Sequence, residues 1–187
     1  ELEKDLGYKI KIGKHIKFDP GRLDKVWIKN CVAIGLAGNF VEPLEATSIG
    51  TTIQQTFLLM HNLQSNSESI RKEYNERVEG IMNNIRDFVF LHYLSHNKKN
   101  KFWKSYTADN APSSLKRLLS IAKKRLLIDQ DIEGGDYKLF WSKNFIQVLY
   151  GINFYKDNKD IKQQYKYVPD TFKKMMNDYF ENGLKLK

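Results

Sequence analysis

Apolar residues recur every three or four positions along two long stretches of the chain, and this spacing constrains the fold more than any other feature. The first stretch follows Pro43 and predicts a helix that begins near Ala46 or Thr47. Its apolar residues share one helical face: Ile49, Ile53, Phe57, Met60 and Leu63. The second follows Ser65, which with Glu68 forms a candidate capping box. Its stripe is expected to pack in the core: Ile70, Tyr74, Val78, Ile81, Ile85, Phe88 and Val89.

The remaining patterns predict further helices after the second stripe and short strands before Pro43. Pro112 suits the first turn of a helix that carries Leu115, Leu118, Leu119, Ala122 and Leu126. Helices are also expected over residues 137–150 and 169–181. Residues 8–18 alternate like a β-hairpin, and the apolar run 26–34 resembles a buried strand. The sequence predicts a mainly α fold with a short β-rich N-terminal part (α+β), divided into residues 1–45 and 46–187.

Composition and charge narrow the class of protein. The 187 residues are 41% hydrophobic and 13% aromatic, which is enough apolar material for one folded core. The net charge of +9 would favour an anionic partner, and a basic helical nucleic-acid-binding module is the alternative that this charge leaves open. The lysines are scattered, however, whereas such a module needs them on one face. Cys31 is the single cysteine, and we expect a cytoplasmic protein without a membrane partner, a disulfide or a metal site.

The common nucleotide, metal and nucleophile motifs are absent from the sequence, and the segment around Pro43 is its most distinctive feature. Glu42 and Glu45 flank this proline just before a predicted helix start. Main-chain N–H groups in the first turn of a helix lack partners and attract anions, so Thr47 and Ser48 are candidate anion-binding residues. The alternative is that Thr47 or Ser48 simply caps the helix and that Glu45 favours its dipole.

Two aromatic pairs, Phe102-Trp103 and Phe140-Trp141, could enclose a planar substrate, although such pairs are more often part of a core. Asp136 lies four residues before Phe140. It would share a helical face with Phe140 if the helix already included it, and Gly135 argues against that.

The segment from Trp27 to Thr47, with the sequence WIKNCVAIGLAGNFVEPLEAT, resembles the signature of the flavin-dependent tryptophan halogenases. The order of later motifs is also similar to that family: Arg86-Asp87-Phe88, Leu91-His92-Tyr93, Phe102-Trp103, Phe140-Trp141 and Val148-Leu149-Tyr150-Gly151. The resemblance implies the C-terminal portion of an FAD-dependent, monooxygenase-like α/β enzyme. Residues 1–45 would then belong to its flavin-binding module and residues 46–187 to its substrate-binding part.

By this resemblance, Glu45 corresponds to the catalytic glutamate in the substrate pocket, and the backbone of Thr47 and Ser48 to the halide site. Ile49, with Thr47, would contact the cofactor. Asp136, Phe140 and Trp141 fall where the family surrounds a bound indole. Ala46 and Ser48 replace the family's usual serine and glycine, which main-chain halide contacts tolerate.

The activity that the resemblance implies uses reduced FAD, oxygen and a halide to produce hypohalous acid, which a lysine and the glutamate direct onto an aromatic ring. A separate flavin reductase would supply the reduced FAD, and a homodimer is compatible with this activity. The family's GxGxxG motif, lysine and WxWxIP motif lie upstream of the signature and are absent here, so this chain alone should not halogenate. Its usual tyrosine pair has no counterpart near residues 129–136, which leaves tryptophan, another indole or a phenol as substrate. A non-catalytic member of the family is the other alternative.

Overall fold

The computed structural model describes residues 2–11, 13–14, 17, 19–94, 101–159, 161 and 174. The α-helices are α1 (Leu2–Leu6), α2 (Thr47–Asn62), α3 (Glu68–Tyr93), α4 (Lys101–Lys104), α5 (Ser113–Ala122) and α6 (Ser142–Gly151). The strands are β1 (Gly21–Arg22), β2 (Trp27–Ile28), β3 (Cys31–Val32) and β4 (Asn39–Phe40). The described 3-10 helices between them are η1 (Gly35–Ala37), η2 (Leu44–Ala46), η3 (Ala108–Asn110), η4 (Asp129–Asp131) and η5 (Gly135–Tyr137). The expected mainly helical fold with short strands is confirmed.

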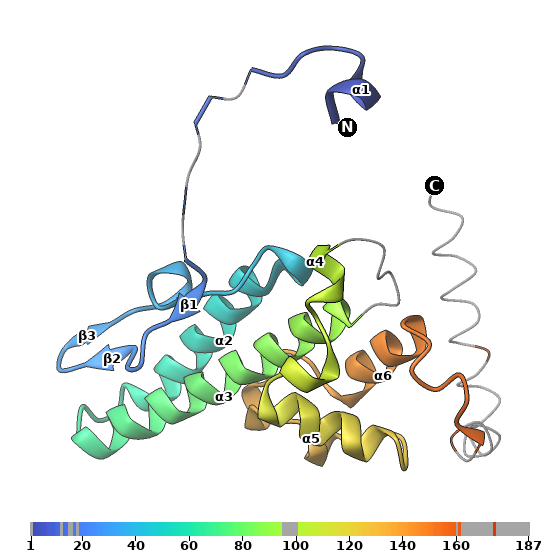
Figure 1. Ribbon diagram of the computed structural model, residues 1–187. Helices are drawn as coiled ribbons and strands as arrows, with labels where there is room; N and C mark the ends of the chain where they lie inside the picture. The colour runs from blue at the N-terminus through green and yellow to red at the C-terminus, as the bar shows by residue number, and fades with distance from the viewer. Residues whose placement is uncertain are drawn as a thin grey trace.

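The long helix α3 is the centre of the fold, with α2 and the strands on one side and α5 and α6 on the other (Figure 1). Its predicted apolar stripe is buried as expected, from Tyr74 to Val89, with Ile70 half-buried at the edge. The helix begins later than the predicted capping box. The side chain of Ser67, rather than Ser65, accepts a hydrogen bond from the backbone N–H of Ile70, at 3.3 Å.

Helix α2 begins at Thr47, as predicted, but it turns its polar face inward. The buried residues of α2 are Thr47, Thr51, Gln55, Leu58 and Asn62. The predicted apolar stripe is exposed: Ile49, Ile53, Phe57, Met60 and Leu63 are each 49–67% accessible. This is the reverse of what an amphipathic surface helix does in water.

Hydrogen bonds to main-chain groups allow α2 to bury these polar side chains. Thr51 donates to the carbonyl of Thr47 at 2.6 Å, and Asn62 donates to the carbonyl of Leu58 at 2.7 Å. Gln55 Oε1 accepts from the backbone N–H of Gly35, at 2.7 Å. Buried polar groups cost little when they are hydrogen-bonded, so the two bonds within α2 permit the inward orientation. The bond to Gly35 joins α2 to another segment and stabilises this orientation.

The strands form two small antiparallel pairs instead of one buried strand. β1 pairs with β4, and β2 pairs with β3 across a turn in which Lys29 adopts a left-handed φ of 54°. The prediction of a single strand over residues 26–34 is therefore wrong, because the chain reverses within that run. In the predicted hairpin of residues 8–18, the described residues form no strand, and residues 12, 15, 16 and 18 lie outside the described part.

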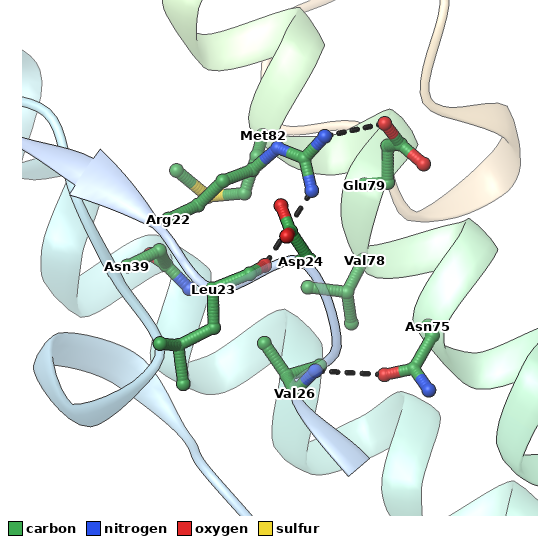
Figure 2. Close-up of a pocket in the computed structure, with 9 residues that line it drawn as sticks. All are labelled: Arg22, Leu23, Asp24, Val26, Asn39, Asn75, Val78, Glu79 and Met82. Atoms are coloured by element: carbon green, nitrogen blue, oxygen red, sulfur yellow. Dashed lines mark hydrogen bonds and ion pairs between the residues drawn. The ribbon is translucent and has the colours of Figure 1, made fainter. Parts of the chain in front are cut away.

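Two asparagines on α3 attach distant segments of backbone to this helix. Asn75 Oδ1 accepts from the N–H groups of Val26 and Trp27, both at 2.8 Å (Figure 2 draws the bond to Val26), and its Nδ2 donates to the Trp27 carbonyl. Asn84 makes the same kind of contact farther along α3, accepting from the N–H of Phe140 and donating to its carbonyl, both at 2.9 Å. These amides fix the strands and the chain entering α6 at set positions along α3.

The C-terminal helices follow the predicted pattern less closely. α5 buries Leu115, Leu118, Leu119 and Ala122 as expected, and Pro112 stands at its N-cap position. α6 begins at Ser142 rather than near residue 137, because Gly134 and Gly135 both adopt positive φ and η5 follows. Apart from residue 174, the predicted helix over 169–181 lies outside the described residues. None of the described helices is long and apolar enough to cross a membrane.

Candidate active site

The loop that enters α2 has an unusual backbone conformation at two successive residues. Glu45 has φ 59° and ψ 22°, and Ala46 has φ 51° and ψ 33°, so both are left-handed although neither is glycine. Such conformations cost roughly 1–3 kcal/mol each and tend to occur at functional sites. The Ala46 N–H donates to the Pro43 carbonyl at 3.2 Å, which closes η2 just before the helix.

Among the described residues, no side chain caps the N-terminus of α2. Ala46 holds the cap position and has no hydrogen-bonding side chain. Thr47 is buried, and its hydroxyl donates to the carbonyl of Glu42 at 3.2 Å instead of accepting from the helix. The alternative that Thr47 or Ser48 caps the helix is therefore wrong. The first-turn N–H groups of a 16-residue helix, with the positive end of its dipole behind them, are left without a side-chain cap.

Glu42 and Tyr93 tie this loop to the end of α3. The Tyr93 hydroxyl donates a hydrogen bond to Glu42 Oε2, across 51 residues of sequence. Hydrogen bonding to Glu42, with a smaller contribution from burial, raises the pKa of Tyr93 from 10.0 to about 12. The Tyr93 ring stacks on Trp103 at 5.7 Å and lies 4.7 Å from the ring of Tyr106. An aromatic cluster thus holds the hydroxyl that anchors the loop.

Glu45 and Ile49 are both exposed near the start of α2. Glu45 is exposed, and among the described residues no hydrogen bond or ion pair engages its carboxylate. Ile49 is 67% exposed one residue after Ser48. The two glutamates of the loop therefore differ: Glu42 is hydrogen-bonded to Tyr93, whereas Glu45 is exposed and has no such partner among the described residues.

The predicted substrate residues after Gly135 are in three different environments. Asp136 is exposed in η5 and shares no helix with Phe140. Phe140 is buried and stacks on Phe88 with ring centroids 3.8 Å apart, so its ring packs in the core. Trp141 is half-buried, and Lys138 Nζ lies 4.3 Å from its ring centroid. Trp141 is thus the better placed of the aromatic pair to reach a ligand.

A close contact brings this segment beside the first turns of α2. A Cβ atom at Gly50 would lie only 2.8 Å from Leu139 Cδ1, so Leu139 packs directly on the α2 backbone there. Gly50 comes two residues after Ser48 on the helix. The helix that carries the predicted halide residues therefore contacts the segment that carries the predicted substrate residues, through Gly50 and Leu139.

Two pockets of the described surface lie away from this site. Figure 2 shows the one between β1 and α3, where Arg22 pairs with Glu79 and the space is too small for a water molecule. A second groove of about 430 Å³ runs beside β2 and the start of α3 and mixes acidic with basic side chains. Neither is lined by a predicted site residue.

Sequence reasoning missed the residues that hold the loop. The sequence places Tyr93 in a family motif and Glu42 beside Pro43, but it does not predict their contact. No spacing rule indicates a contact between residues 51 positions apart. Lys138 was also missed. It is a buried lysine whose ammonium donates to the Asp129 carbonyl at 3.1 Å while covering one face of Trp141.

The family profile described as tryptophan halogenase matches residues 1–166, which is most of the chain. The chain belongs to the tryptophan halogenase family. A tryptophan 6-halogenase of Streptomyces toxytricini is 35% identical over 104 residues, covering 54% of this chain and 20% of that enzyme. Among solved structures, a tryptophan halogenase from Shewanella frigidimarina matches 81% of this chain and 30% of its own, with 29% identity and a TM-score of 0.71.

A flavin-dependent halogenase from Xanthomonas campestris is similar to the same degree, with 30% identity and a TM-score of 0.69 over 80% of this chain and 30% of its own. The chain spans between 20% and 31% of the length of the first curated relatives. It therefore has the fold of a C-terminal part of a halogenase.

Proposed function

We propose that this chain is the halide- and substrate-binding part of a flavin-dependent halogenase acting on tryptophan or a related indole or phenolic aromatic. The observation that supports it most is the uncapped start of α2, preceded by the left-handed pair Glu45 and Ala46. The carboxylate of Glu45 lies next to the main-chain N–H groups of the first turn of α2 in the sequence. Halogenation needs both: a place for an anion and a base near the ring.

The halide would bind the N–H groups of Thr47 and Ser48. The dipole of α2 favours a negative charge at this end, and the absence of a side-chain cap leaves the donors available. The serine in place of a glycine at position 48 is compatible with this role because Ser48 lies within the regular helix. Its main-chain group, not its side chain, would make the contact.

Glu45 would assist the reaction on the aromatic ring. An attacking electrophilic halogen leaves positive charge on the ring carbons, and the carboxylate can stabilise this charge and accept the proton that departs. Glu45 is suited to this because its carboxylate is not engaged in the described fold. The hydrogen bond between Tyr93 and Glu42 would keep the loop, and with it Glu45, in position.

The substrate would lie against the segment from Asp136 to Trp141. Trp141 offers one ring face for stacking, since Lys138 covers the other. Asp136 is exposed and could pair with an ammonium group on the substrate. Phe140 would contribute by fixing this segment, through its stacking on Phe88 and its bonds to Asn84.

The residues present fit one edge of FAD. Uncapped N–H groups at the start of α2 suit the electron-rich pyrimidine edge of a reduced flavin, and the exposed Ile49 beside them suits its flat ring. Reduced FAD, supplied by a separate reductase, would provide together with oxygen the oxidising power that converts halide to hypohalous acid. The remaining contacts of the cofactor would come from outside this chain.

The experiment replaces Glu45 by Gln in the complete enzyme, supplied with FAD, a reductase and halide, and measures product by mass spectrometry. The change removes the charge and nearly keeps the shape. We expect kcat to fall by about 10²–10³-fold, the scale typical of losing one general base or charge-stabilising group.

The matched control is Glu76→Gln, which alters an exposed glutamate on α3 whose carboxylate lies 3.8 Å from Lys72. It should leave halogenation unchanged. Undiminished product from Glu45→Gln would show that the residue assignment is wrong. If the wild-type protein halogenates none of a panel of indoles and phenols, the result would favour a non-catalytic family member.

A further inference from the structure

The outward side of α2 is an apolar surface that runs the whole length of the helix. It consists of Ile49, Ile53, Phe57, Met60 and Leu63, called here the apolar face of α2, each 49–67% exposed. No residue of α2 is Asp, Glu, Lys or Arg, although 28% of the chain is charged. Exposed helix faces in water normally carry charges. A helix without them is typical of one that is buried on both sides.

The helix cannot rotate to bury this face within the chain. Its inner side is fixed by contacts that depend on orientation: Gln55 holds the backbone of Gly35, and Tyr74 of α3 donates to the Gln55 carbonyl at 3.2 Å. Gly35 itself approaches Thr52 so closely that a Cβ there would clash with the threonine hydroxyl. The outward orientation of the apolar face of α2 is therefore specified by the fold.

The length of the relatives indicates what covers it. This chain spans only 20–31% of the first curated relatives, so a halogenase contains a much larger part that this chain lacks. The apolar face of α2 also begins at Ile49, next to Thr47 and Ser48, where the flavin is proposed to lie. A body that covers the face would border the flavin directly.

We propose that the apolar face of α2 is the docking surface for the remaining, flavin-binding part of the halogenase. The surface would pack against an uncharged apolar region of that part and hold the α2 N-terminus beside the cofactor. The inference rests on membership of the family, on the exposed stripe and on the flavin position given in the proposed function. It does not require that the protein halogenate.

The test uses Met60, which is 62% exposed on this surface, and Met82, which is 4% exposed in the core of this chain. The full-length protein, as its gene encodes it, is treated with dilute hydrogen peroxide. The oxidation of Met60 and of Met82 is then followed by mass spectrometry of the proteolytic fragments that contain them. We expect Met60 to oxidise at least tenfold more slowly than methionine in a short peptide, at a rate close to that of Met82. Oxidation of Met60 at the peptide rate, with Met82 protected, overturns the proposal.

Protection of Met60 that disappears when the protein is diluted to monomers also overturns it, because the cover would then be a second copy. Two variants sharpen the result. Ile53→Ser on the apolar face of α2 should raise Met60 oxidation at least fivefold. Ile128→Ser changes an isoleucine of the same 49% exposure away from this helix and should leave it unchanged. Both wild-type methionines are native probes, so the decision does not depend on a variant that folds.

Discussion

Helices α2 and α3 follow each other in the chain and carry similar apolar periodicity, yet they use it in opposite ways. α3 buries its stripe, from Tyr74 to Val89, in the centre of the fold. α2 exposes its stripe and buries threonine and glutamine side chains that bond to main-chain groups. An apolar stripe thus marks a surface that will be covered, but the cover need not belong to the same part of the protein. In this chain the exposed stripe adjoins the candidate active site.

The largest expected difference is in the free energy of unfolding when isoleucine is replaced by alanine on each of the two helices. Ile81→Ala on α3 removes a side chain with 0% exposure and should cost about 2–5 kcal/mol of unfolding free energy. Ile53→Ala on α2 should change it by less than about 0.5 kcal/mol in this 187-residue chain, because the side chain is already half in water. Urea unfolding of both variants measures this. Equal losses would mean that the stripe of α2 is buried after all.

The second largest effect on the free energy of unfolding is expected for the buried side-chain amides of Asn84 on α3 and Gln55 on α2. Asn84→Ala leaves the N–H and carbonyl of Phe140 without partners in a buried place, which should cost about 2–4 kcal/mol. Gln55→Ala removes one bond, to Gly35, and also removes a buried Nε2 that has no partner, so about 1–2 kcal/mol is expected. Denaturant midpoints of the two variants give the comparison. A larger loss for Gln55→Ala would contradict the central role of α3.

The smallest effect concerns the link between α3 and the loop before α2. Tyr93→Phe removes the hydrogen bond to Glu42 and should cost about 1 kcal/mol at neutral pH. The folded state keeps the Tyr93 proton up to a pKa of about 12, whereas the unfolded chain loses it near 10.0. The contribution is therefore complete below pH 10 and is lost as the pH rises towards 12.

Thermal unfolding of wild type and Tyr93→Phe between pH 8 and 12 would record this, and the gap between them should close at the alkaline end. Tyr8→Phe, at an exposed tyrosine near the start of the chain, is the control and should match wild type throughout. A constant gap from pH 8 to 12 would show that Glu42 does not hold the Tyr93 proton.

Periodicity predicted the helices well and the strands poorly. The start of α2 and the buried stripes of α3 and α5 agree with the sequence pattern. The hairpin of β2 and β3 was missed because Lys29, which is not a typical turn residue, adopts the left-handed conformation that reverses the chain. The late start of α6 followed from two glycines whose effect on the backbone the periodicity did not reveal.

The location of the candidate site came from resemblance, and its geometry came from the structure. Periodicity alone left Thr47 and Ser48 as helix caps, and that interpretation fails because Ala46 holds the cap position. The left-handed pair Glu45 and Ala46 could not be predicted, since residues with a Cβ rarely adopt positive φ. The sequence also could not predict that the polar face of α2 points inward, because threonine and glutamine are typical of solvent-facing positions.

The most direct test of the central claim is to locate a halide in the complete enzyme. Crystals grown with bromide would be measured near the bromine absorption edge, so that anomalous scattering marks each bound ion. We predict a bromide peak within hydrogen-bond distance, about 3.2–3.5 Å, of the main-chain nitrogens of Thr47 and Ser48, and its retention in Glu45→Gln. A well-occupied bromide elsewhere, with none at the N-terminus of α2, would contradict the account.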